Sequence, residues 1–197
     1  NNVIATSTAY FGGAVADNAA AVEQVAVKAS FGSNGCPAIV GGTLSQSINI
    51  GGIVGKNEGY VRNSYVDANL HVILNKSASI VAIGGIVGNN FSGKSQSGTS
   101  TTGVGAINYC YSTGAIDVTV DGDTNNVRLY AAGIAGRNSQ KAISSCFTLV
   151  NIAVDNTAND EAGELKNNDT NTLFLGFGFG SMENNSTVTK CWYAPQN

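Results

Sequence analysis

The chain has 197 residues, of which 43% are hydrophobic and only 12% are charged, with 25 glycines and two prolines. This length and composition suit a single elongated domain with a core of its own. The net charge of −3 gives no electrostatic footprint for nucleic acid or for an anionic membrane, and no run reaches the roughly 20 consecutive apolar residues of a membrane span. The chain begins without a recognisable leader, and we expect Asn1 to mark a processed or trimmed start.

The first recurring unit is anchored at Gly12-Gly13, which follow an alternating apolar pair, Ala9 and Phe11. Alternation at a period of two, bounded by glycine and asparagine, is typical of half-buried strands. The next stretch, 18–29, reads NAAAVEQVAVKA. We interpret it as a degenerate first set of strands, and a short capping helix is the alternative.

The second unit shows a four-part pattern most clearly. An apolar pair at 48–50 precedes the anchor Gly51-Gly52, and a short run at 53–57 ends in small and amide residues. A third block, 61–65, ends in a small residue followed by an aromatic one, and an alternating strand occupies 70–74. Each unit therefore predicts about three short strands.

The pattern returns three more times, with anchors at Gly84-Gly85, Ala132-Gly133 and Gly176-Phe177. A repeated core with variable insertions predicts stacked repeats rather than one irregular domain. The repeated structural positions are Gly51, Gly52, Ile53, Gly55, Gly84, Gly85, Gly133, Ile134, Gly136, Cys110, Cys146 and Cys191. The alignment also predicts a core that contains Ile53, Val61, Ile107, Ile134, Ile143 and Val188.

We therefore expect an all-β fold, a right-handed parallel β-solenoid of about five repeats with degenerate ends, in one repeat domain spanning 1–197. A β-sandwich is the alternative, because regularly spaced short strands also suggest one. A sandwich has no reason to reuse the same glycine and cysteine positions in each segment. Two polar stretches, 91–105 and 155–172, are expected to be insertion loops.

Three of the four cysteines occupy one repeat position, Cys110, Cys146 and Cys191, with Ser64 as the fourth member. On stacked strands about 4.8 Å apart, neighbouring cysteines could form a disulfide. We favour a ladder of reduced, buried thiols and expect no partner for Cys36. The spacings match no zinc pattern, and we expect neither a metal nor a cofactor.

An aromatic residue follows each of these positions, and the aromatic column consists of Tyr65, Tyr111, Phe147 and Trp192. We expect a buried or half-buried stack, with a corner of the chain just before it. The alternative is an exposed strip in which Tyr65, Tyr111 and Trp192 contact a ligand such as a sugar ring.

Residues suited to catalysis are few. The single histidine, His71, alternates with apolar neighbours and should point outward, and no HExxH motif is present. The candidate acids for a carbohydrate-active enzyme are Asp121, Asp123, Asp155, Asp160, Glu161, Glu164 and Asp169. They lie in stretches that we interpret as solvated loops, and we expect no catalytic residue.

The segments GGIVGKNEGYVRNSY and AGIAGRNSQKAISSCF resemble the GLUG repeat, a glycine-rich motif of bacterial secreted or surface proteins. The resemblance implies a non-enzymatic segment of a larger polypeptide, as in candidate adhesins and the non-catalytic regions of immunoglobulin A-cleaving surface proteases. An extracellular adhesion module that binds host glycans or extracellular proteins, or a passive stalk, is therefore expected. The alternative function is a polysaccharide lyase or glycosidase on a β-helix.

Overall fold

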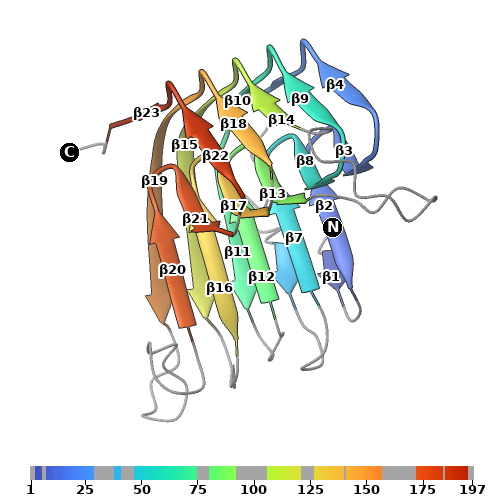
Figure 1. Cartoon of the computed structure of the whole chain (residues 1–197). Helices are drawn as coiled ribbons and strands as arrows, with labels where there is room; N and C mark the ends of the chain where they lie inside the picture. The colour runs from blue at the N-terminus through green and yellow to red at the C-terminus, as the bar shows by residue number, and fades with distance from the viewer. Residues whose placement is uncertain are drawn as a thin grey trace.

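The computed structural model describes residues 3–5, 8–28, 38–40, 47–74, 80–91, 106–120, 127–139, 141–156, 172–183 and 185–194. These ranges form strands and turns without any helix, so no helix in them could cross a membrane. Figure 1 shows the strands lined up in parallel layers, with the N-terminus at one end of the stack and the C-terminus at the other.

The chain passes through four sheets in a fixed order, and we call one passage a circuit. The first sheet consists of β2 (Ala9–Gly12), β7 (Ser47–Gly51), β12 (Ile80–Gly84), β16 (Arg128–Ala132) and β20 (Thr172–Gly176). The second sheet consists of β3 (Val15–Asn18), β8 (Val54–Asn57), β13 (Val87–Phe91), β17 (Ala135–Ser139) and β21 (Phe179–Met182). The third sheet consists of β4 (Ala21–Glu23), β9 (Tyr60–Arg62), β14 (Ala106–Asn108), β18 (Ala142–Ser144) and β22 (Thr187–Thr189).

The fourth sheet completes each circuit and has a short and a long part. The short part contains β5 (Ala26–Val27), β10 (Tyr65–Asp67) and β23 (Trp192–Tyr193), and the long part contains β1 (Val3–Ala5), β6 (Ala38–Val40) and β11 (Leu70–Leu74). Two ten-residue strands, β15 (Tyr111–Val120) and β19 (Phe147–Asn156), run through both parts. A circuit therefore contributes to four sheets, where the sequence predicted about three strands.

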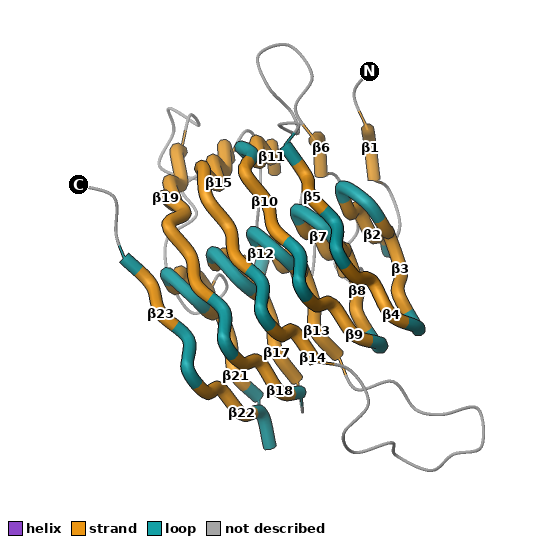
Figure 2. The backbone as a smooth tube through the Cα atoms, turned by 90° about the horizontal axis from the view of Figure 1, so that it is seen from above, coloured by secondary structure: helices purple, strands orange, loops and turns teal. Residues whose placement is uncertain are grey.

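Every pairing between described strands is parallel and joins equivalent strands of successive circuits. A β-sandwich of the immunoglobulin type is antiparallel, so that alternative is wrong. The tube in Figure 2 shows the circuits lying side by side along one axis. The arrangement is consistent with a parallel β-solenoid.

The register follows the predicted repeat alignment. Gly51 lies opposite Gly12 and Gly84, and the anchor series continues through Ala132 to Gly176. The stretch 18–29 contains β4 and β5 and no described helix, so the interpretation as a first set of strands is confirmed for residues 18–28.

Apolar side chains form two core clusters because the alternation turns one face of each strand inward. One cluster lies between the first sheet and the long part of the fourth, and includes Ile48, Val72 and Leu129. The other cluster lies between the second sheet, the third sheet and the short part of the fourth, and includes Ile53 and Ile107. The interior of the stack is thus filled by residues that recur from circuit to circuit.

Five of the six predicted core residues, Ile53, Val61, Ile107, Ile134 and Ile143, are buried. The sixth, Val188, is 36% exposed, so that prediction is wrong. Val188 lies in β22, which among the described strands pairs only with β18 and so is covered from one side.

Candidate functional site

A left-handed corner precedes the fourth sheet in every circuit. Equivalent residues with φ between 51° and 55° form this corner: Gln24, Asn63, Tyr109, Ser145 and Lys190. The residue after the corner turns its side chain inward, as Ser64, Cys110 and Cys146 show by their burial. The corner predicted just before the aromatic column is therefore confirmed.

The Ser/Cys column, Ser64, Cys110, Cys146 and Cys191, closes this corner from inside. Ser64 Oγ donates a hydrogen bond to the Arg62 carbonyl at 2.8 Å, across the left-handed residue. The Cys110 and Cys146 thiols donate to the carbonyls of Asn108 and Ser144 at 3.3 and 3.2 Å in the same way. In these three circuits a small side chain with one donor therefore occupies this position, whereas Val25 occupies it in the first circuit and donates its backbone N–H to Ser64 Oγ at 3.1 Å.

The cysteines of this column, Cys110, Cys146 and Cys191, are free thiols. The hydrogen bond with Cys110, together with burial, raises the pKa of Cys146, and burial raises the pKa of Cys191. Because the thiolate is the nucleophile, these two thiols are not activated for covalent chemistry. Cys36 lies outside the described residues.

A buried ladder of asparagine side chains, which we call the Asn ladder, crosses four circuits at the end of the second sheet. Asn18 Nδ2 donates to Asn57 Oδ1 at 2.8 Å, Asn57 to Asn90 at 2.7 Å, and Asn90 to Asn138 at 2.7 Å. The ladder ends at Met182, the equivalent residue of the fifth circuit. Sequence reasoning treated these amides only as the end of an apolar run, although their recurrence at one repeat position was a usable signal.

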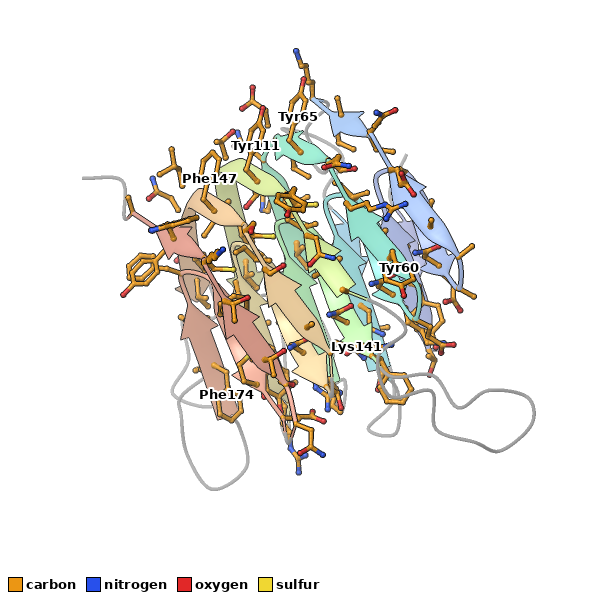
Figure 3. All side chains as sticks on the ribbon, turned by 45° about the horizontal axis from the view of Figure 1, so that its top comes forward. Tyr60, Tyr65, Tyr111, Lys141, Phe147 and Phe174 are labelled. Atoms are coloured by element: carbon orange, nitrogen blue, oxygen red, sulfur yellow. The ribbon has the colours of Figure 1, made fainter. Side chains whose placement is uncertain are left out.

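The aromatic column is a half-exposed stack on the outside of the fourth sheet. The Tyr65 and Tyr111 rings lie 4.8 Å apart and nearly parallel, and the Tyr111 and Phe147 rings lie 5.0 Å apart. Figure 3 shows these three side chains in one row along the stack. The Lys28 ammonium lies 5.7 Å from the centre of the Tyr65 ring.

This stacking limits what the column can bind. A sugar ring stacks on a free aromatic face, but both faces of Tyr111 are covered by its neighbours. Trp192, in register with Phe147, is 64% exposed, and it is the only tryptophan of the chain. Of the three predicted ligand-contact residues, Trp192 is the most accessible.

The repeated glycines lie where backbones approach closely. A Cβ on Gly52 would lie 2.1 Å from the Gly85 carbonyl oxygen, and one on Gly85 would lie 2.1 Å from that of Gly133. Close stacking of successive circuits is therefore the reason for glycine at these two positions. Gly55 and Gly136 instead approach the backbone of the first sheet, near Phe11 and Ile83 respectively.

The outer faces of the first two sheets meet at a junction that sequence reasoning did not anticipate. The Lys56 ammonium lies 5.3 Å from the centre of the Tyr10 ring, and the Arg137 guanidinium lies 5.4 Å from that of Tyr130. Lys56 also forms ion pairs with Asp17 and Glu58. Charged and aromatic side chains thus cover this junction together.

Lys141, which immediately precedes β18, is a buried lysine. It is 3% exposed, and its position is labelled in Figure 3. Burial lowers the pKa of its ammonium, and the negative charge of Glu58 only partly offsets that effect.

The candidate catalytic residues are dispersed or lie outside the described ranges. His71 is half-buried, its Nε2 is 3.2 Å from Thr119 Oγ1, and it lies in register with Asp117 on the fourth sheet. Asp155 is exposed near the end of β19, whereas Asp121, Asp123, Asp160, Glu161, Glu164 and Asp169 are outside the described residues. In the described part of the chain, no group of three His, Cys, Asp or Glu side chains is placed so that it could hold a metal ion.

The two predicted insertion loops follow strands of different sheets. The stretch 91–105 connects β13 to β14, and the stretch 155–172 connects β19 to β20. Phe91, Asp155, Asn156 and Thr172 belong to strands, so the predicted bounds are too wide by these residues, and the rest of both stretches is outside the described ranges. No family model, curated protein or solved structure matches this chain.

Proposed function

We propose that the chain is a right-handed parallel β-solenoid segment of a bacterial secreted or cell-surface protein of the GLUG-repeat type, and that it serves as a non-enzymatic stalk. The observation that carries this proposal is the set of side-chain columns that continue from circuit to circuit. The Asn ladder, the Ser/Cys column and the aromatic column each connect three or more circuits.

Such columns resist bending because their inner members, Asn57, Asn90 and Tyr111, are held by the circuits on both sides. Buried amide hydrogen bonds are costly to leave unmade, and stacked aromatic pairs add about 0.5 to 1.5 kcal/mol each. Side chains that stack on their equivalents in the neighbouring circuits hold the circuits at a fixed spacing. This favours the role of a spacer of constant length.

Adhesion is the second candidate, and the exposed Trp192 and Tyr193 favour it. Host glycans or extracellular proteins would be the partners. A carbohydrate-active enzyme is the alternative, and of its candidate acids Asp155 alone lies among the described residues, exposed near the end of β19.

The stalk is tested by placing the chain between a bacterial surface anchor and an epitope. Antibody access to the epitope should exceed that obtained with a flexible Gly-Ser linker of equal residue number. Equal access with the linker would contradict the stalk. Binding of the purified chain to glycans or matrix proteins, abolished by Trp192→Ala, would favour adhesion instead.

A further inference from the structure

Tyr109 is a strained and exposed aromatic residue in the third circuit. It is 66% exposed, more than any other large apolar side chain of the described residues. Its φ of 54° at the left-handed corner is one that a bulky side chain rarely adopts. Backbone strain of this kind costs free energy and is concentrated at functional sites. The needs of folding therefore do not explain a tyrosine at this corner.

Circuits lie on both sides of Tyr109. The Asn63 N–H donates a hydrogen bond to the Asn108 carbonyl at 3.1 Å, and the Tyr109 N–H donates to the Ser144 carbonyl at 3.2 Å. These bonds join the corners of the second, third and fourth circuits in register. The exposure of Tyr109 is thus a property of its corner and does not arise at an end of the stack.

The corner residues next to Tyr109 in the stack are shorter and polar. Asn63 precedes it, Ser145 follows it, and Lys190 lies one circuit further on. Within the described ranges, no stacked ring and no cation packs on the Tyr109 ring. Its faces are therefore accessible, whereas both faces of Tyr111 are covered.

The space above Ser145, which we call the Ser145 gap, has room for one ring. Neighbouring circuits lie about 4.8 Å apart, so Tyr109 and Lys190 are separated by about 9.6 Å, with only the small serine between them. The Tyr65 and Tyr111 rings lie 4.8 Å apart on the same side of the stack, so one ring fills one circuit spacing. A ring in the gap would thus contact Tyr109 on one face.

The three residues around the Ser145 gap differ in chemistry. Tyr109 supplies an aromatic face, and Ser145 supplies a hydroxyl group. Lys190 is exposed, and no carboxylate of the described residues forms an ion pair with it. An apolar face, a hydroxyl and a cation match a sugar ring with an acidic substituent, because the ring stacks, its hydroxyls bond and its anion pairs.

We propose that Tyr109, Ser145 and Lys190 form a binding site for an acidic sugar. The sugar ring stacks on Tyr109, a ring hydroxyl bonds with Ser145 Oγ, and a carboxylate or sulfate pairs with the Lys190 ammonium. The site deepens adhesion, the second candidate function, and rests on it, whereas the stalk does not depend on it. The strained tyrosine is then retained for binding at the expense of stability.

An array of immobilised neutral, carboxylated and sulfated glycans tests this site with the whole chain. The parent should bind acidic glycans, and separate carboxylated and sulfated members identify the anion. Tyr109→Asn should weaken binding by about tenfold or more, the effect of removing an aromatic anchor. Asparagine occupies the same corner at Asn63, so this loss would not reflect unfolding. Tyr109→Phe keeps the ring and should bind as the parent does.

Two outcomes separate the site from adhesion in general. A parent that binds no acidic glycan would overturn the site and adhesion to acidic glycans together. Equal binding by the parent and Tyr109→Asn would overturn the site alone, because the sugar would then be held elsewhere on the chain.

Lys190→Gln tests the proposed charge pairing. It should reduce the preference for acidic over neutral glycans by about three- to fivefold, the worth of one exposed ion pair. The matched control is Gln24→Ala, at the same corner position but two circuits from Tyr109 on the Asn63 side. This control should bind as the parent does. An unchanged preference in Lys190→Gln, or an equal loss in Gln24→Ala, would contradict binding in the Ser145 gap.

Discussion

Asn57 donates a hydrogen bond from Nδ2 to Oδ1 of Asn90 at 2.7 Å, although 33 residues separate them in the chain. Both side chains are completely buried. Asn57 and Asn90 each accept from the preceding circuit and donate to the next, so the ladder fixes the register of the second sheet. A shift by one residue would leave these buried groups without partners.

Replacing Asn90 with alanine should therefore destabilise the chain by about 1 to 3 kcal/mol, because the Asn57 donor and the Asn138 acceptor lose a partner. Urea unfolding measures this loss. Asn89→Ala, next to it in β13, is the control and should cost less, because Asn89 is half-buried and its Oδ1 has no hydrogen-bond partner. Equal losses in both variants would show that the middle of the ladder has no special role.

Gly85→Ala should be destabilising by about 1 to 3 kcal/mol, because its new Cβ would meet the Gly133 carbonyl oxygen. Gly52→Val and Gly85→Val should cost more than an average surface change for the same reason. Gly178→Ala is the control, since a Cβ there meets nothing within 4 Å. Thermal unfolding that ranks Gly178→Ala with Gly85→Ala would contradict the close stacking of circuits.

Ile143→Ala and Ile134→Ala should each cost about 2 to 5 kcal/mol, as expected for truncation of a buried isoleucine. Val188 follows Ile143 in the same column but is partly exposed, so Val188→Ala should cost much less. Denaturant unfolding of the three variants gives the comparison. Losses below about half a kcal/mol at both isoleucines would mean that the core has been misplaced.

The double variant Tyr65→Ala and Tyr111→Ala should lower stability, because it removes both stacked contacts of Tyr111. Each pair is worth about 0.5 to 1.5 kcal/mol, and chemical denaturation measures the loss. Binding to a glycan array should not change. A folded double variant of parental stability that loses glycan binding would make the column a ligand site instead.

Tyr109→Asn should stabilise the chain by up to about 1 kcal/mol, because asparagine tolerates the left-handed conformation better than tyrosine. Asn63 already occupies the equivalent corner with φ 51°. Tyr109→Val, with a β-branched side chain, should destabilise. Melting temperatures in the reverse order would mean that the corner does not depend on the residue at its left-handed position.

Much of the architecture was predictable from the sequence because a parallel stack repeats the same environment in every circuit. The alternation of Ile48 and Ile50, or of Leu70 and Val72, reports which face is buried, and the recurring anchor Gly51-Gly52 gives the register between circuits. The inward-facing Ser/Cys position and the corner before it were also predictable, because the same residue types recur there in successive repeats.

The sequence by itself determined the strands, their order and their register, because those depend on local alternation and on the repeat. The tertiary structure alone decided how the sheets are placed against one another, and hence the meeting of Lys56 with Tyr10. It also decided the exposure of Val188, whose column position is the same as that of the buried Ile143. A repeat pattern assigns equal environments to equivalent residues, but burial depends on whether another circuit lies beyond them.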